Sequence, residues 1–190
     1  MIITIARQCG CGAVRVGKLL AQHYGIPFYT RQNLLQMASQ RGVLDEIDER
    51  PVDELLFAMT SFGESQRELT EHPLRTLADM IGDEDCIIIG RCGNYIFRER
   101  KDLVSVFLSG NHHDRVLDIQ QEQQLSWEEA EEFVEHAEDC RIAYHKYYTG
   151  LTWGNADDYD ICLDTTRLGV EATAQMIEEY VARVEGDLKK

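Results

Sequence analysis

The stretch Met1-Ile-Ile-Thr-Ile-Ala6 is followed at once by Arg7-Gln-Cys-Gly-Cys-Gly-Ala-Val-Arg-Val-Gly-Lys18. Its β-branched run predicts a buried strand, its glycines predict a tight turn, and the residues after them predict an amphipathic helix with Val14, Leu20 and Ala21 facing inward. Glycines let backbone N–H groups curl around phosphate oxygens, and the dipole of the following helix favours negative charge there. The stretch therefore predicts an anion site.

The frame of this loop is not the standard one. The segment Gly12 to Lys18 satisfies G-x-x-x-x-G-K, the pattern of phosphate-binding loops, but Leu19 follows in place of the Ser or Thr that would hold Mg²⁺. Because the turn is expected at Gly10-Cys-Gly12, Lys18 would lie a helical turn or more beyond the bound phosphate. We therefore expect the phosphate cradle at Gly10 to Gly12.

In that frame Ala13 occupies the usual lysine position, and Arg15 is the nearest cation able to reach back to a phosphate. Two other interpretations of the loop stay open. The turn can serve packing alone, without a ligand. A dinucleotide site would need a glycine where Arg15 stands and an acidic residue after the second strand, where the sequence has Thr30-Arg31; Arg31 would then meet a ribose phosphate.

Composition limits the class of protein. With 190 residues, of which 44% are hydrophobic and 28% charged, the chain is expected to form one domain, and it contains no apolar run near the length that spans a bilayer. The formal net charge of −15 argues against nucleic-acid or acidic-membrane partners, which need a basic face. We expect a cytoplasmic protein.

The six cysteines are scattered, which fits a reducing compartment. Cys9-x-Cys11 has no second Cys-x-x-Cys or spaced His pair to complete a metal site, so we expect no resident metal. A redox link between Cys11 and Cys92 stays open, because both are expected at the same edge of the sheet.

Five short apolar segments are predicted as strands, and most are continuous runs, as is typical of strands covered on both faces in a parallel sheet. Helical segments lie between them, so the order predicts an open, doubly wound α/β sheet. The predicted strands are Ile2 to Ala6, Pro27 to Tyr29, Cys86 to Ile89, Leu103 to Leu108, and Tyr159 to Leu163.

Two helix boundaries can be predicted from their capping residues. Gly25 is expected to end the first helix, and Ser126-x-x-Glu129 is a capping box that is expected to open a later one. The second helix is predicted to present one apolar face, which consists of Ala130, Phe133, Val134, Ala137 and Tyr144.

Two connections are longer than a simple crossover needs. Residues 31–85 contain helical patterns at Leu34 to Ser39, Val52 to Phe62 and Leu74 to Ile81, and predict a small helical insertion. Residues 111–150 predict a second helical excursion. Two helical flaps over the carboxyl edge of a parallel sheet indicate a site that closes around its ligand.

The scarce cations mark candidate site residues. Ile87-Ile-Ile-Gly-Arg91 puts a guanidinium at the carboxyl edge beside the first loop, where it suits a phosphate or a pyrimidine edge, or else a salt bridge. Between Arg115 and Arg141 there are nine Asp or Glu and no Lys or Arg. Arg141 and Lys146 lie on the second flap, where cations can serve a transferring phosphoryl group or merely the helix dipole.

Four motifs in this order resemble the cytidylate kinase-like family of P-loop proteins, and together they span nearly the whole chain. The resemblance implies a three-layer α/β P-loop NTPase fold in a single domain. It has a five-stranded parallel sheet, a helical monophosphate-binding insertion at about 31–85 and a helical lid at about 111–150. The motifs are Ile5-Ala-Arg-Gln-Cys-Gly-Cys-Gly, Ile87-Ile-Ile-Gly-Arg-Cys, Tyr147-Tyr-Thr-Gly-x-x-Trp-Gly-Asn-Ala and Tyr159-Asp-Ile-Cys-Leu-Asp-Thr-Thr.

The resemblance also implies roles for matching residues. The loop Gly10 to Gly12 would cradle donor phosphates, Arg91 would contact the acceptor nucleotide, and Arg141 would stabilise charge on the transferred phosphoryl group. The loop departs from the family, because the usual Gly-Ser-Gly-Gly-Arg reads Gly10-Cys-Gly-Ala-Val14 here and Thr30 replaces an acidic residue expected after the second strand.

The resulting hypothesis is a kinase-like phosphotransferase that moves the γ-phosphoryl group of ATP, as its Mg²⁺ complex, to a nucleoside monophosphate (cytidylate-like) or a related small acceptor. The alternative is a nucleotide-binding regulatory protein whose degenerate loop has lost the chemistry. The oligomeric state is open. The candidate residues are Arg15, Arg141 and Lys146 for catalysis; Arg7, Gly10, Cys11, Gly12, Ala13, Val14 and Lys18 for ATP; and Arg31, Arg75 and Arg91 for the substrate.

Overall fold

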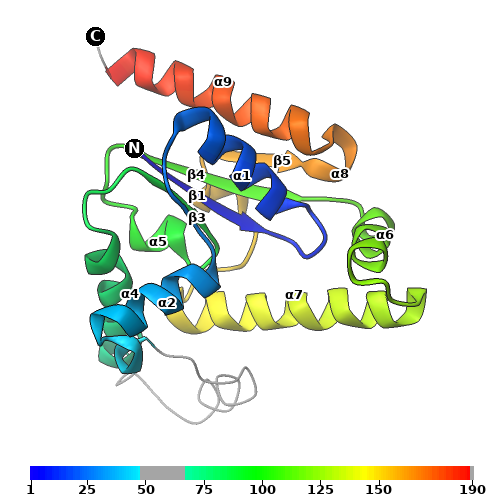
Figure 1. Cartoon of the computed structure of the whole chain (residues 1–190), viewed down its shortest axis with the longest axis horizontal. Helices are drawn as coiled ribbons and strands as arrows, with labels where there is room; N and C mark the ends of the chain where they lie inside the picture. Colours follow the sequence, from blue (N-terminus) through cyan, green and yellow to red (C-terminus); the bar gives the residue numbers. More distant parts are fainter. Residues whose placement is uncertain (48–66, 189–190) are drawn as a thin grey trace.

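The structure is a computed structural model that describes residues 1–47 and 67–188. Its centre is a five-stranded parallel sheet in the order β2-β3-β1-β4-β5, which confirms the predicted α/β class (Figure 1). The strands are β1 (Ile2–Arg7), β2 (Phe28–Tyr29), β3 (Cys86–Ile89), β4 (Leu103–Ser109) and β5 (Ile161–Asp164).

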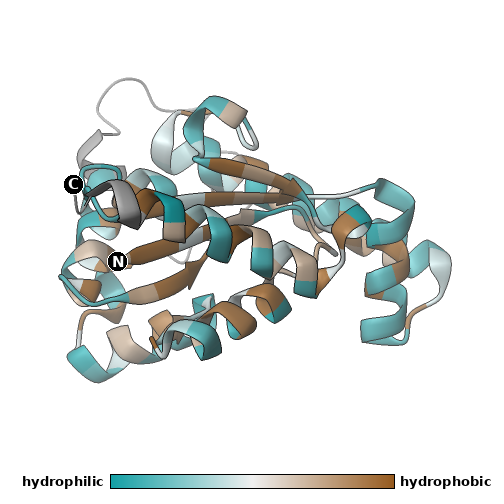
Figure 2. Ribbon diagram, turned by 90° about the horizontal axis from the view of Figure 1, so that it is seen from above, coloured by the Kyte–Doolittle hydropathy of each residue, from teal (hydrophilic) through white to brown (hydrophobic). Residues whose placement is uncertain are grey.

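The strands confirm the five predicted segments, and β1, β2 and β4 each differ from the predicted bounds by one residue at one end. β5 begins two residues after the predicted Tyr159, because a 3-10 turn at Ala156–Asp158 leads into it. The central strand β1 is paired on both sides, so that Ile2 lies opposite Cys86 of β3 and Leu103 of β4. Apolar residues follow one another along β1 because helices cover both faces of the sheet (Figure 2).

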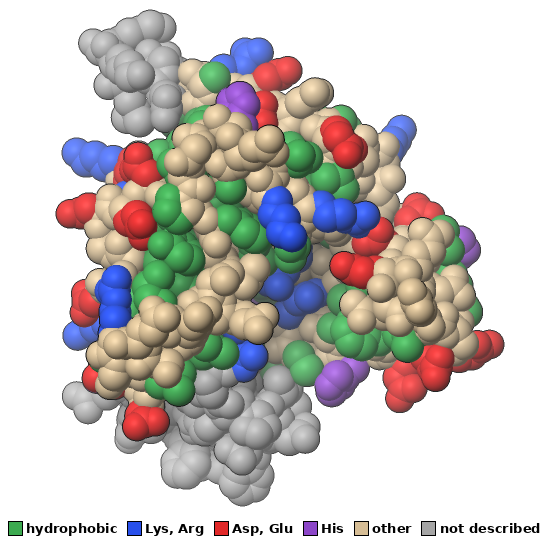
Figure 3. All heavy atoms as spheres, viewed as in Figure 1, with side chains coloured by type: hydrophobic (Ala, Val, Ile, Leu, Met, Phe, Trp, Pro, Cys, Tyr) green, Lys and Arg blue, Asp and Glu red, His purple; other side chains and the backbone are tan. Residues whose placement is uncertain are grey.

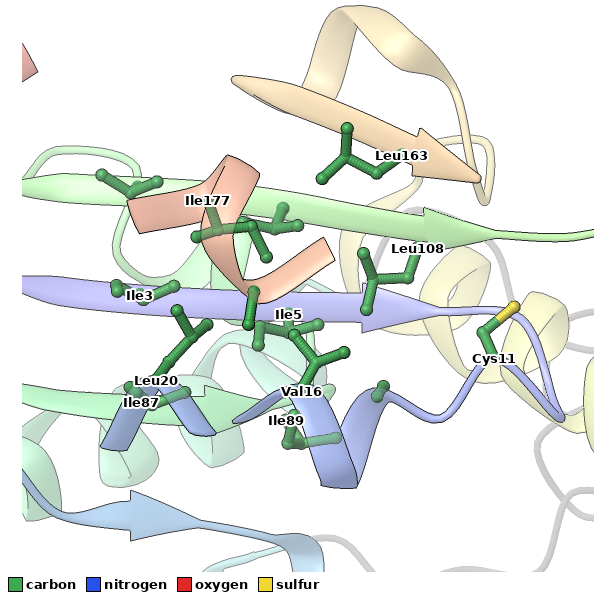
Figure 4. Packing of buried hydrophobic residues seen from close by; sticks show 14 of the residues in the cluster. Ile3, Ile5, Cys11, Val16, Leu20, Ile87, Ile89, Leu108, Leu163 and Ile177 are labelled. Carbon is green, nitrogen blue, oxygen red and sulfur yellow. The ribbon is translucent and has the colours of Figure 1, made fainter. Parts of the chain in front are cut away.

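Helices α1 (Ala13–Tyr24) and α9 (Val170–Leu188) cover one face of the sheet and build the largest core cluster (Figure 4). Gly25 ends α1 in a left-handed conformation, as predicted. The prediction that Val14 faces inward is wrong, because Val14 is 41% exposed. The helix begins at Ala13, so its buried stripe follows the helical repeat from there and passes beside Val14; the stripe is Ala13, Val16, Gly17 and Leu20.

The long connection between β2 and β3 contains helices α2 (Arg31–Arg41) and α4 (Arg67–Ile81) and a 3-10 turn at Leu44–Glu46. These confirm two of the three predicted helical patterns, and the third, Val52 to Phe62, lies outside the described residues. Thr30 opens α2 with a capping box. The two helices bury apolar residues against the sheet, in a cluster that includes Leu34, Ala38, Leu77, Met80, Ile2 and Ile88.

The second excursion contains α6 (His112–Gln123) and α7 (Trp127–Thr149). The predicted capping box at Ser126 and Glu129 is present. α6 stands beyond the carboxyl ends of the strands, whereas α7 runs back along the side of the sheet opposite α9, with the short helix α5 (Gly93–Ile96) above it (Figure 1). The part of this excursion that lies over the sheet edge, α6 and the adjoining part of α7, is called the flap below; that residues 111–150 close around a ligand stays a prediction.

The prediction of one apolar face on α7 is only partly correct. Ala130 and Val134 pack with Val116 and Ile119 of α6, but Phe133 is 46% exposed. The reason is that α6 covers a narrow strip of α7 and Phe133 lies outside it. After β5 the chain forms the short helix α8 (Thr165–Leu168) and then α9. Among the described residues, none of the helices has the length and apolar character needed to cross a membrane.

Candidate functional site

The glycine turn lies at the carboxyl end of β1, where it was expected. Gly10 and Gly12 have φ angles of +80° and +60°, and Gly12 is the N-cap of α1. A Cβ at Gly10 would collide with the backbone carbonyl of Arg115, so glycine is required there by packing against α6 as well as by the turn. The loop is thus held from outside by the flap.

Two residues farther along α1 show which part of the G-x-x-x-x-G-K pattern belongs to the turn and which to the helix. Gly17 is buried, and a Cβ there would collide with the ring of Phe28. Lys18 is exposed in the middle of the helix. Gly17 is therefore a packing residue, and Ala13 to Lys18 is helix, so Gly17 and Lys18 do not belong to a phosphate-binding loop.

Arg115 holds the loop from α6. This residue is only 6% exposed, and its guanidinium donates hydrogen bonds to the carbonyl oxygens of Cys9 (3.0 Å) and Gly110 (3.1 Å). It thereby ties the turn after β1 to the end of β4. Sequence reasoning missed Arg115; its place as the last cation before a long acidic stretch was the available signal.

Three arginines come together beside the loop. Burial, together with the positive charges of Arg141 and Arg91, lowers the pKa of Arg7 to about 10. The Arg7 guanidinium lies directly against Gly90, where a Cβ would collide with its Nη1. Lys and Arg side chains gather in a hollow near the middle of one face (Figure 3). The structure thus brings together the predicted residues Arg7, Arg91 and Arg141.

Arg91 is held by an unusual backbone. Gly90, Arg91 and Cys92 have φ angles of +74°, +58° and +57°, so three successive residues are left-handed. For a non-glycine residue this conformation costs roughly 1 to 3 kcal/mol and is found most often at functional sites. The guanidinium carbon lies 5.1 Å from the ring centroid of Tyr144 of α7. The strained turn therefore aims Arg91 toward α7.

The carboxylate of Glu138, one turn before Arg141 on α7, lies among these cations. Its Oε2 accepts a hydrogen bond from the backbone N–H of Cys9 (2.9 Å), and its Oε1 accepts one from Trp153 Nε1 (2.8 Å). The same Oε2 lies 3.8 Å from Arg115 Nη1 and 3.7 Å from Arg141 Nη1. Sequence reasoning missed Glu138 and Trp153 as site residues, although the i, i+3 spacing of Glu138 and Arg141 was a signal.

Two predicted catalytic cations have other partners. Arg15 forms an ion pair with Asp118 of α6 (2.5 and 2.7 Å), and both residues line a cavity of about 240 Å³ together with Gly10, Cys11 and Thr166. Lys146 donates to the carbonyl of Gly150 (2.7 Å) and caps the end of α7. These contacts do not bring either side chain to the three arginines. The catalytic roles of Arg15 and Lys146 stay predictions.

The remaining predicted substrate residues lie on the insertion. Arg31 is exposed at the start of α2. Arg75 on α4 pairs with Glu71 (3.0 Å) and lines a groove of about 200 Å³ with Tyr95 and Arg98. Their roles stay predictions.

All six cysteines are free. Cys11 and Cys92 are buried, and burial raises the pKa of each thiol, to about 11 for Cys11 and about 12 for Cys92. Such thiols are poor nucleophiles at neutral pH.

A resident metal does not fit this site. The described residues contain no group of three or more His, Cys, Asp or Glu side chains that could hold a metal ion. Val14, which has no hydroxyl, directly follows Ala13, at the position where a magnesium-binding loop has a Ser or Thr after its lysine. Any Mg²⁺ would be bound by phosphate oxygens and water, with few protein ligands.

Solved structures share this fold. A protein from Eubacterium ventriosum, described as uncharacterized, is 26% identical with a TM-score of 0.77, and the match covers 96% of this chain and 98% of that one. A shikimate kinase from Bacteroides thetaiotaomicron is 19% identical (TM-score 0.52; 96% and 98% covered). A gluconokinase from Sinorhizobium meliloti is 14% identical (TM-score 0.56; 98% and 94% covered).

No curated protein matches the sequence. The family model described as the cytidylate kinase-like family matches residues 2–167, a span that contains the glycine turn, the three arginines and both helical excursions. The fold of the structural neighbours is that of the P-loop kinases. This protein therefore belongs to the cytidylate kinase-like family.

Proposed function

We propose that this protein is a small-molecule phosphotransferase, which moves the γ-phosphoryl group of ATP to a nucleoside monophosphate (cytidylate-like) or a related small acceptor. The observation that carries the proposal is the convergence of Arg7, Arg91 and Arg141 beside the glycine turn. Phosphoryl transfer depends mainly on positioning and on fixed positive charge around the transferred group. In a chain of net charge −15, three clustered guanidinium groups support such a role.

The chain's residues divide the task as follows. Backbone N–H groups of Gly10 to Gly12, at the start of α1, face the donor phosphates. Arg91 binds the acceptor and Arg141 stabilises negative charge on the moving phosphoryl group, while Arg31 and Arg75 bind the acceptor from the insertion. Arg15 and Lys146 would have to leave Asp118 and the end of α7 to take part. Mg²⁺, when it arrives with ATP, neutralises phosphate charge.

The test is ADP release measured with a panel of nucleoside monophosphates. Arg141→Ala should lower kcat by about 10²- to 10³-fold with a smaller change in KM, because a cation that acts on the transition state is removed. Arg183→Ala, at an exposed position on α9, is the matched control and should leave turnover unchanged. Folded protein without turnover on any acceptor would refute the enzyme, and an unaffected Arg141→Ala would refute the role of Arg141.

A second candidate is a nucleotide-binding protein without phosphoryl transfer. It is favoured by Ala13 at the usual lysine position and by the Glu138 carboxylate on the loop N–H of Cys9. Calorimetry would then give tight nucleotide binding in a protein that has no turnover. The cytoplasmic location and the absence of nucleic-acid and membrane partners also stay predictions.

A further inference from the structure

The Glu138 carboxylate is bound as a ligand would be. Its two oxygens accept hydrogen bonds from a loop backbone N–H and from an indole N–H, and two guanidinium groups lie within 4 Å. The donors come from distant parts of the sequence, because Cys9 follows β1, Arg115 lies on α6 and Trp153 follows α7. Backbone N–H, indole and guanidinium groups together are a donor set for an oxyanion.

This donor set has more capacity than one carboxylate uses. Arg141 Nη1 is buried and has no hydrogen-bond partner, and it stands 3.7 Å from Glu138 Oε2, too far for a hydrogen bond. Arg7, which is partly buried, adds a further positive charge that acts on Arg141. A carboxylate offers two oxygens in a plane, whereas a phosphate offers three or four oxygens directed tetrahedrally. A phosphate would therefore engage more of these donors.

We propose that Glu138 is an internal stand-in for a phosphate-type oxyanion. The incoming anion takes the N–H of Cys9, Nε1 of Trp153 and the guanidinium of Arg141, and the Glu138 side chain leaves the site. The inference deepens the proposed function, on which it rests for the identity of the natural anion as a nucleotide phosphoryl group. No covalent step is involved.

The internal carboxylate lowers the affinity for external anions. The protein binds only when Glu138 is displaced, so the apparent Kd is the intrinsic Kd divided by the fraction of molecules in the open form. One hydrogen bond to a charged group contributes about 1.5 to 3 kcal/mol, and its loss corresponds to a factor of roughly ten or more in this equilibrium. Removing the charge of Glu138 should thus strengthen anion binding, whereas removing a positioning residue would weaken it.

Trp153 provides a direct readout, since its indole N–H is bound to Glu138. The chain has two tryptophans, so Trp127→Phe leaves Trp153 as the only tryptophan. In this background pyrophosphate is titrated while tryptophan emission is followed, and calorimetry measures the affinity. We expect an emission shift that saturates with binding, and a Kd about tenfold lower in Glu138→Gln.

Glu135→Gln is the matched control, because Glu135 is exposed three residues earlier on the same helix. It should leave the Kd for pyrophosphate unchanged. Glu138→Asp is the second variant, in case Glu138→Gln fails to fold; its shorter side chain withdraws the carboxylate and should also lower the Kd. A Kd that Glu135→Gln lowers as much as Glu138→Gln would overturn the inference, because the effect would then be general charge.

Other outcomes are equally decisive. Weaker pyrophosphate binding in Glu138→Gln would overturn the inference and make Glu138 a positioning residue for Arg141. Binding without a change in Trp153 emission, or no binding by either protein, would overturn it as well. Displacement of Glu138 in a protein without turnover would support the inference while the proposed phosphotransferase fails. Turnover without displacement would overturn the inference alone.

Discussion

The contact between Gly17 and Phe28 shows that a phosphate-binding sequence pattern serves helix packing in this chain. The two residues complete a G-x-x-x-x-G-K pattern, yet Gly17 lies in α1 with the ring of Phe28 where its side chain would be. Lys18, next to it, is exposed. A phosphate-binding lysine must stand at the first turn of the helix, where the N–H groups are free. Lys18, the sixth residue of α1, stands beyond that turn.

Gly17→Val should therefore destabilise the protein by roughly 2 kcal/mol or more. The added side chain would overlap the Phe28 ring and crowd Ile89, and overpacking of this kind costs about 1 to 3 kcal/mol in well-packed cores. The free energy of unfolding from urea titration checks this. Lys18→Ala, at the adjacent exposed position, should change the same quantity by less than about 0.5 kcal/mol. Equal stability of the two variants would contradict the placement of Gly17 against Phe28 inside α1. A large loss of ADP release in Lys18→Ala would show that Lys18 does bind the phosphates.

The position of Glu138 in the site could not be predicted from the sequence. It lies in a run of carboxylates that is indistinguishable in sequence from a solvated helix face, and its partner Cys9 is 129 residues away. Arg91 and Arg141 could be predicted, because each follows an interpretable pattern, a strand end in one case and a gap in positive charge in the other. The contacts that bring them together depend on how α7 docks, and no local pattern encodes that.

At the scale of elements, strands were predicted better than helix faces. Continuous apolar runs such as Ile2 to Ala6 allow few interpretations, since a strand covered on both faces needs apolar residues at successive positions. The burial of a helical residue depends instead on the neighbour that the helix meets. Phe133 and Val14 are apolar and suitably spaced, but α6 and the sheet contact other residues of α7 and α1. Sequence periodicity predicts an apolar stripe along a helix, but tertiary packing decides how that stripe is rotated about the helix axis.

His145 on α7 makes the packing of that helix sensitive to pH. The residue is 1% exposed, its ring packs edge-on against Trp153 at 5.3 Å, and neither ring nitrogen has a hydrogen-bond partner. Burial lowers the pKa of His145, an effect that Asp158 opposes and Lys146 reinforces. The native state therefore holds a neutral imidazole, and protonation favours the unfolded chain.

We expect the free energy of unfolding to fall as pH drops below about 6.5, the unfolded value, toward the lower folded value. Because the unfolded chain binds the additional proton, His145 contributes a loss of up to about 1 kcal/mol between pH 6.5 and 5.5. Urea titrations at several pH values measure this slope. His145→Phe should reduce the slope, whereas His112→Gln, at an exposed position on α6, should retain it. A slope that is equal in all three proteins would contradict the role of His145.

At the scale of the whole molecule, the distribution of charge is the main constraint on stability. The chain has 34 acidic and 19 basic residues, yet Arg7, Arg91 and Arg141 lie close enough for two of them to lower the pKa of the third. Like charges held together in a partly desolvated place destabilise the folded state. Such an arrangement persists when an anionic ligand offsets the repulsion, which is the expected compromise between stability and function.

Arg7→Gln should accordingly raise the free energy of unfolding in buffer without polyvalent anions, by roughly 1 to 3 kcal/mol, because it removes a partly buried cation that lies near two others. In the unchanged protein, pyrophosphate at about 100 times its Kd should add about 2.7 kcal/mol to stability, and in Arg7→Gln it should add much less. Thermal and urea unfolding with and without pyrophosphate measure both quantities. Arg183→Gln on α9 is the control for loss of one exposed positive charge, and it should retain the anion effect. If Arg7→Gln is less stable than the unchanged protein without pyrophosphate, Arg7 serves packing, and the repulsion among the three arginines is not what limits stability.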